Sequence, residues 1–96
     1  MNRPTLEEIF LMRFDVKALA IAAGLIWGLV LLLVGGANLV AAPYGQAFLE
    51  MAASVYPGYT AAASFGQVIL GTLYGLVDGA IGGAIFAWLY NCFVKA

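Results

Sequence analysis

Asp78 is the only acidic residue in the apolar stretch from residue 61 to 94, where it stands among glycines in the segment GLVDGAIGGA. A carboxyl group at such a place could accept hydrogen bonds, bind a cation or carry a proton. The same stretch contains no Lys, Arg or His, and its single thiol, Cys92, is the only cysteine in the chain. Catalytic pairs and metal sites need several such groups close together, so we predict no enzyme activity, no metal site and no cofactor.

The composition predicts an integral membrane protein. The chain has 96 residues, of which 65% are hydrophobic and 9% charged, and its mean hydropathy is +1.00. A soluble domain has about a quarter of its residues charged, and this chain cannot cover its surface with so few. The net charge of −1 and the four Lys and Arg residues argue against nucleic acid as a partner.

Two segments are long enough to cross a bilayer, and we predict an all-α membrane protein built as a two-helix transmembrane hairpin. Residues 16–40 carry no charge after Lys17, and residues 61–94 carry none except Asp78. At about 1.5 Å per residue, each segment exceeds the roughly 30 Å hydrocarbon core of a bilayer.

Two shorter segments complete the predicted fold. Residues 1–15 form an amphipathic N-terminal segment, because Thr5 and Glu8 have the spacing of a capping box and apolar residues follow on one side. The external connector spans residues 41–60, and within it residues 46–55 could form a short interfacial helix with Phe48 and Met51 toward lipid and Glu50 toward water.

The positions of the cations predict the orientation. Arg3, Arg13 and Lys17 precede or open the first span and Lys95 follows the second, whereas the connector carries Glu50 and no cation. By the positive-inside rule both termini are cytoplasmic, and we place the protein in the inner (cytoplasmic) membrane of a bacterium.

Glycines mark a thin face on each predicted span. At about 100° per residue, the glycines of each helix gather on one side, as in the small-xxx-small pattern that lets two helices approach closely in lipid. The predicted helix-packing residues are Gly24, Gly28 and Gly35 in the first span and Gly71, Gly75, Gly79, Gly82 and Gly83 in the second. These faces would pack against each other or against a copy of the chain.

Asp78 falls on the glycine face of its helix and is therefore expected to face protein or a wet cavity. Exposing a charged Asp to the centre of a bilayer costs about 3 kcal/mol. Since no cation lies nearby on either span, we expect a largely neutral carboxyl group. In a hairpin the indole N–H of Trp27 is a candidate donor to it, and Asn38 and Gln67 would meet nearer the outer surface.

The two spans share a sequence pattern. Residues 24–37 read GLIWGLVLLLVGGA and residues 71–84 read GTLYGLVDGAIGGA. The match indicates either an inverted repeat or two helices of similar composition. In this alignment Asp78 stands opposite Leu31.

Three stretches carry a resemblance to a known family. FDVKALAIAAGLIWGL (14–29), SVYPGY (54–59) and GLVDGAIGGAIFAWLYN (75–91) resemble small two-span bacterial membrane proteins that are often labelled bacteriophage-holin-like or uncharacterised. A holin also carries a charged tail, whereas this chain has only Lys95 after Trp88.

Three functions fit these features. The first is a structural or accessory subunit that assembles, through its glycine faces, with its own copies or with a larger membrane complex. The second is a holin-like oligomeric pore lined by Asp78, Gln67 and Asn38. The third is a proton or ion relay through Asp78. The accessory role needs no chemistry beyond helix packing in lipid, and we therefore favour it.

Overall fold

The computed structural model describes Thr5 and residues 13–94 of the chain. This part contains three helices and no strand: α2 (Val16–Val40), α3 (Gln46–Val55) and α4 (Phe65–Phe93). The all-α class is thereby confirmed, and α2 and α4 are each long and apolar enough to cross a membrane. Except for Thr5 and residues 13–15, the predicted amphipathic segment lies outside the described residues.

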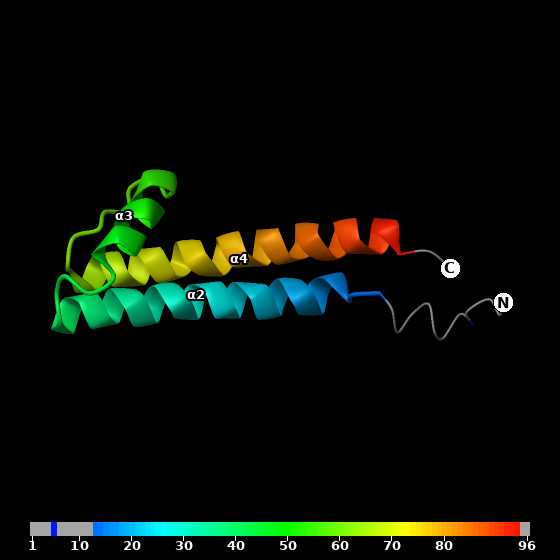
Figure 1. The fold of residues 1–96 in the computed structure, drawn as a ribbon, viewed down its shortest axis with the longest axis horizontal. Coiled ribbons are helices and arrows are strands. Elements are labelled where there is room, and N and C mark those ends of the chain that lie inside the picture. The colour runs from blue at the N-terminus through cyan, green and yellow to red at the C-terminus, as the bar shows by residue number, and fades with distance from the viewer. Residues whose placement is uncertain (1–4, 6–12, 95–96) are drawn as a thin grey trace.

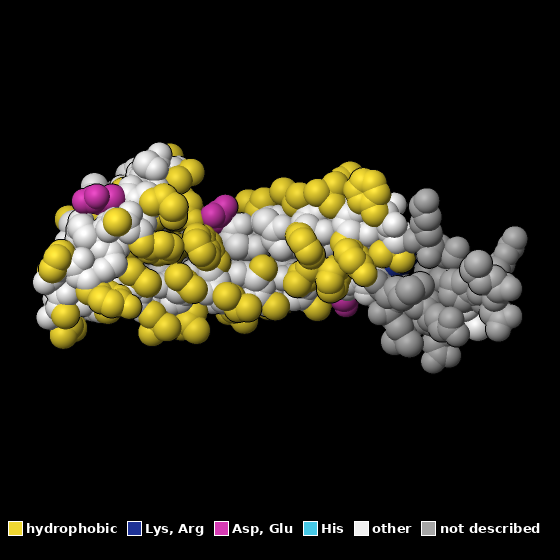
Figure 2. Space-filling view, in the orientation of Figure 1, with side chains coloured by type: hydrophobic (Ala, Val, Ile, Leu, Met, Phe, Trp, Pro, Cys, Tyr) yellow, Lys and Arg dark blue, Asp and Glu magenta, His cyan; other side chains and the backbone are white. Residues whose placement is uncertain are grey.

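The helices α2 and α4 lie side by side and antiparallel, and α3 lies beside the end where α2 stops and α4 starts (Figure 1). We call this the connector end and the opposite end the terminal end. Hydrophobic side chains are spread along the whole visible face of the two long helices (Figure 2).

Side-chain caps set where the long helices begin. The Asp15 carboxylate accepts the backbone N–H of Ala18 at 3.1 Å, so α2 begins at Val16, the predicted first residue of the first span. The Ser64 hydroxyl accepts the backbone N–H of Gln67 at 3.1 Å and starts α4 at Phe65. The second span was predicted from residue 61, and the helix begins four residues later because residues 61–64 are needed to return the chain from α3.

Glycines form the contact between the two long helices. A methyl group added to Gly79 would lie 2.6 Å from the carbonyl oxygen of Ala23 and 2.9 Å from the Cα of Gly24. One added to Gly83 would lie 2.8 Å from the carbonyl oxygen of Leu19. The backbones are therefore in direct contact, as the small-xxx-small pattern predicts.

Six of the eight predicted packing glycines lie in this contact, and two do not. The six are Gly24, Gly28, Gly35, Gly75, Gly79 and Gly83. Gly71 instead packs against the ring of Tyr59, which comes from the connector. Gly82 was predicted to pack but has no atom within 4 Å of an added Cβ, because the contact follows the four-residue series of Gly75, Gly79 and Gly83 and leaves Gly82 to one side.

Gly28 and Gly75 are equivalent positions in the shared sequence pattern, and they meet. A Cβ at Gly75 would lie 3.0 Å from the Cα of Gly28. Two copies of a motif related by a two-fold axis touch at equivalent residues where the axis passes. The equivalent pair Gly36 and Gly83 does not follow this symmetry, because Gly83 packs on α2 whereas Gly36 has nothing within 4 Å of an added Cβ.

The connector folds back onto the long helices. Leu49 and Ala52 of α3 are buried in a cluster with Leu31, Tyr56 and Tyr59. Phe48 is half-buried and packs edge-on against Trp27, with ring centroids 5.8 Å apart. This side of α3 therefore faces α2, while Glu50 and Met51 remain exposed.

The terminal end is closed by an amide–backbone pair. The side chain of Asn91 accepts the Phe14 N–H at 2.9 Å and donates to the Phe14 carbonyl at 2.8 Å. The Phe14 ring also packs 4.5 Å from the ring of Tyr90. These contacts fix the start of α2 against the last turns of α4.

Candidate functional site

Asp78 lies near the middle of α4, and its carboxylate is exposed in the isolated chain. Its Oδ2 accepts a hydrogen bond from the Tyr56 hydroxyl at 2.7 Å. The same hydroxyl accepts the indole N–H of Trp27 at 2.8 Å. Three elements thus converge on one hydrogen-bonded chain: α2 through Trp27, the end of the connector helix through Tyr56, and α4 through Asp78.

One prediction about Asp78 needs correction. Trp27 was a candidate donor to the carboxyl group, but Tyr56 stands between them. Because the helix contact runs through Gly75 and Gly79, Asp78 lies beside that contact, where α2 does not cover it.

Aromatic packing holds Tyr56 in place. Its ring stacks on Tyr74 with centroids 4.9 Å apart and planes within 4°, and it meets Tyr59 edge-on at 6.4 Å. The Tyr74 hydroxyl donates in turn to the carbonyl oxygen of Pro57.

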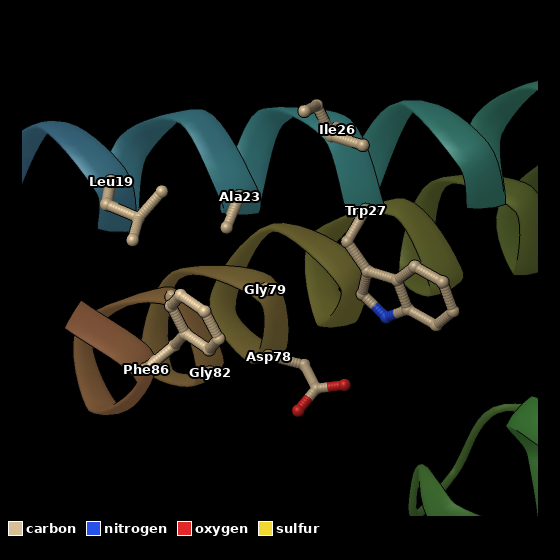
Figure 3. A pocket seen from close by; sticks show the side chains of 9 residues that line it. Leu19, Ala23, Ile26, Trp27, Asp78, Gly79, Gly82 and Phe86 are labelled. Carbon is tan, nitrogen blue, oxygen red and sulfur yellow. The ribbon is translucent and has the colours of Figure 1, made fainter. Parts of the chain in front are cut away.

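An open groove of about 500 Å³ runs from Asp78 toward the terminal end, between α2 and α4. The two helices supply its walls as follows: Leu19, Ala23, Ile26 and Trp27 from α2, and Asp78, Gly79, Gly82, Gly83 and Phe86 from α4. Trp27 and Phe86 lie toward opposite ends, with Asp78 and Gly82 between them (Figure 3). Asp78 is the only charged residue in this lining.

Asn38 and Gln67 hold the connector and lie apart from the groove. Asn38 is 1% exposed and donates to the Tyr44 carbonyl at 2.8 Å and to Gln46 Oε1 at 3.0 Å. Gln67 accepts the Thr60 N–H at 2.8 Å. The hydrogen bonds that the structure describes for Asn38 and Gln67 therefore go to connector groups and do not join these two residues, and neither residue lines the groove beside Asp78.

Sequence reasoning missed Tyr56, Gln46 and Asn91. Tyr56 had no predicted role, and its position before Pro57-Gly58 is the one signal that a turn aims it back at the helices. Gln46 and Asn91 are amides at helix ends, where free backbone groups need partners.

The residues that the structure describes include no group of three His, Cys, Asp or Glu side chains placed to hold a metal ion. Cys92 is exposed near the end of α4. The chemistry available at the groove is therefore that of one carboxylate, one tyrosine hydroxyl and apolar walls.

Comparison of the chain with protein families, curated proteins and solved structures finds no match. The arrangement of the groove itself is thus the basis for assigning a function.

Proposed function

We propose that the protein is a small integral membrane protein of the bacterial inner membrane that acts as an accessory subunit. In this proposal α2 and α4 cross the bilayer as a hairpin, with both termini cytoplasmic and the connector end toward the outside. Helices of 25 and 29 residues, about 37 and 43 Å long, exceed the roughly 30 Å hydrocarbon core. Large apolar side chains such as Leu25 and Val77 point outward from the helix pair, as lipid-facing residues do.

Membrane insertion places Asp78 near the middle of the bilayer. Thirteen residues separate it from Phe65, the first residue of α4, which corresponds to about 20 Å along the helix. Since Tyr56 reaches Asp78, the end of α3 must lie at the depth of the outer half of the bilayer. We therefore propose that the connector re-enters the membrane and is not wholly external.

The connector has the internal hydrogen bonds that this placement requires. Non-helical backbone within a bilayer is tolerated where protein covers it and satisfies its polar groups. Gln46 donates to the Ala61 carbonyl at 3.2 Å, Gln67 accepts the Thr60 N–H, and Tyr74 donates to the Pro57 carbonyl. Side chains of the protein thus replace water at three points of the connector.

The observation that carries the accessory role is the exposed carboxylate of Asp78. A polar carboxyl group is unfavourable against lipid, and the chain covers only one side of it, with Tyr56. The groove beyond it stays open along the inner half of the two helices. We therefore propose that the protein works in association, with this face turned toward its own copies or toward a larger membrane complex. Most of the predicted packing glycines contact the other long helix of the same chain. Gly82 does not, and it is therefore the predicted packing glycine that remains free to contact a partner on this face.

Photo-crosslinking combined with native mass measurement tests this proposal. A photoreactive residue at Ile26, on the groove, should crosslink in native membranes to a copy or to a second protein. The same residue at Leu25 is the matched control, since it has similar exposure at the same depth but points about 100° away. A monomeric mass in nanodiscs with equal, weak crosslinking at both positions contradicts the accessory role.

A further inference from the structure

The groove is closed toward the connector end. Trp27 forms its wall there, and behind Trp27 the connector covers the helices, since Phe48 packs on the Trp27 ring and Tyr56 bonds to its indole N–H. From Leu19 to Trp27 the groove extends over eight residues, about 12 Å of helix. The groove ends at Trp27, because the connector residues Phe48 and Tyr56 contact the other side of this ring.

The size and lining of the groove suit a small molecule. Ligand sites commonly have volumes of about 300–1,000 Å³, mostly apolar walls and a few oriented polar groups. Here the volume is about 500 Å³, and the oriented polar group is the Asp78 carboxylate. Tyr56 holds Oδ2 of this carboxylate, which makes Tyr56 a positioning residue.

The charge of the lining specifies the charge of the occupant. The sequence predicted a neutral carboxyl group because no cation lies near Asp78. A cationic occupant supplies that partner, and one carboxylate without a Lys or Arg in the lining is complementary to a single positive charge. The aromatic rings of Trp27 and Phe86 lie toward the two ends, and aromatic faces attract cations, Trp most strongly. The gap at Gly82, where an added Cβ would meet nothing within 4 Å, leaves room for a bulky apolar group.

We propose that this groove binds a lipophilic monocation, such as a quaternary ammonium or phosphonium compound. Its positive centre lies at Asp78 and its apolar groups lie between Trp27 and Phe86. The inference rests on the proposed membrane insertion, because the bilayer is what concentrates such a compound at this depth. It is independent of the accessory role, since a single chain forms the whole site.

The probe is tetraphenylphosphonium, added to the protein in nanodiscs. Trp27 reports binding through its fluorescence once the other tryptophan is removed by Trp88→Phe, and Trp88 lies outside the groove. We expect saturable quenching. Asp78→Asn, which keeps an oxygen that can accept from Tyr56, should weaken binding at least about tenfold, because the charge is lost. An uncharged tetraphenyl analogue should give no saturable quenching.

Two glycine variants separate the groove from the fold. Gly82→Leu fills the groove and should abolish binding, whereas Gly36→Leu is the matched control and should bind as wild type. Both glycines have nothing within 4 Å of an added Cβ, and Gly36 lies outside the groove. Equal binding by Gly82→Leu and Gly36→Leu overturns the proposal, as does undiminished binding by Asp78→Asn.

The native mass of the same samples distinguishes the ligand proposal from the accessory role. Saturable binding by a monomer supports the groove as a cation site and contradicts the accessory role. If instead Gly82→Leu dissociates an oligomer or complex while the wild type fails to bind the probe, a partner protein fills the groove and the ligand proposal is overturned.

Discussion

The hydroxyl of Tyr56 donates to Oδ2 of Asp78 across 2.7 Å and joins the end of the connector helix to the middle of α4. The Tyr56 hydroxyl also accepts the indole N–H of Trp27. Removing this hydroxyl therefore leaves the Trp27 donor and the Asp78 acceptor without their partner. Tyr56→Phe should therefore destabilise the protein by about 1–2 kcal/mol, which is the cost of losing two partly buried hydrogen bonds. Thermal unfolding in nanodiscs measures the loss.

Tyr44→Phe is the control for this variant, since Tyr44 also lies in the connector but is exposed. It should unfold at the temperature of the wild type. Tyr56→Phe should also shift the Trp27 emission, because the indole N–H loses its acceptor. If both variants unfold alike and the emission is unchanged, the chain from Trp27 to Asp78 does not hold the connector.

Two glycines of α4, Gly79 and Gly82, should respond in opposite ways to substitution by alanine. Gly79→Ala places a methyl group 2.6 Å from the Ala23 carbonyl oxygen, so the two helices must separate, and we expect a loss of about 1–3 kcal/mol. Gly82→Ala meets open space and replaces a helix-interior glycine, so it should be neutral or stabilise by up to about 1 kcal/mol. Chemical or thermal unfolding of both in the same lipid makes the comparison. Equal losses would place the helix contact elsewhere.

The helix bounds and most of the helix contact could be predicted because they depend on local patterns. A run free of charge, the turn residues before Gln46 and the four-residue glycine series each act within a few positions of the chain. The sequence pattern also predicted which face of α4 is thin. It could not show that Gly82 is left uncovered, because on a helical wheel Gly82 lies between Gly71 and Gly75, and only the crossing of the two helices decides which residues are covered.

The site at Asp78 could be predicted only in part. Its depth follows from its position in α4, but its partner depends on a connector that reverses direction and brings Tyr56 back across 22 positions of sequence. No periodicity encodes that reversal. It arises from the burial of Leu49 and Ala52 against the long helices and from amide side chains that bind connector backbone.

Asn91 should control fraying at the terminal end. Its side chain makes two hydrogen bonds to the backbone of Phe14, which precedes the first turn of α2. In Asn91→Ala the Phe14 amide loses its acceptor, so its hydrogen exchange should accelerate, while amides at the contact of Gly28 with Gly75 keep wild-type rates. Cys92→Ala, a change at the neighbouring exposed residue, should leave the Phe14 amide unaffected. An unchanged Phe14 exchange rate in Asn91→Ala would show that this pair does not fix the helix ends.

Single cysteines can measure how deeply the connector lies. In a Cys92→Ala background, a membrane-impermeant maleimide added to the outside of spheroplasts should label Tyr44→Cys, near the connector end of α2. It should not label Val55→Cys, although Val55 is as exposed as Tyr44 in the isolated chain. Val55 precedes Tyr56, which reaches Asp78, and we propose that Asp78 lies near the middle of the membrane. Both cysteines should react after detergent solubilisation, which controls for protein burial. Rapid outside labelling of Val55→Cys in intact membranes would place the connector in water and overturn the re-entrant arrangement. Labelling of Tyr44→Cys from the cytoplasmic side and not from outside would invert the proposed orientation.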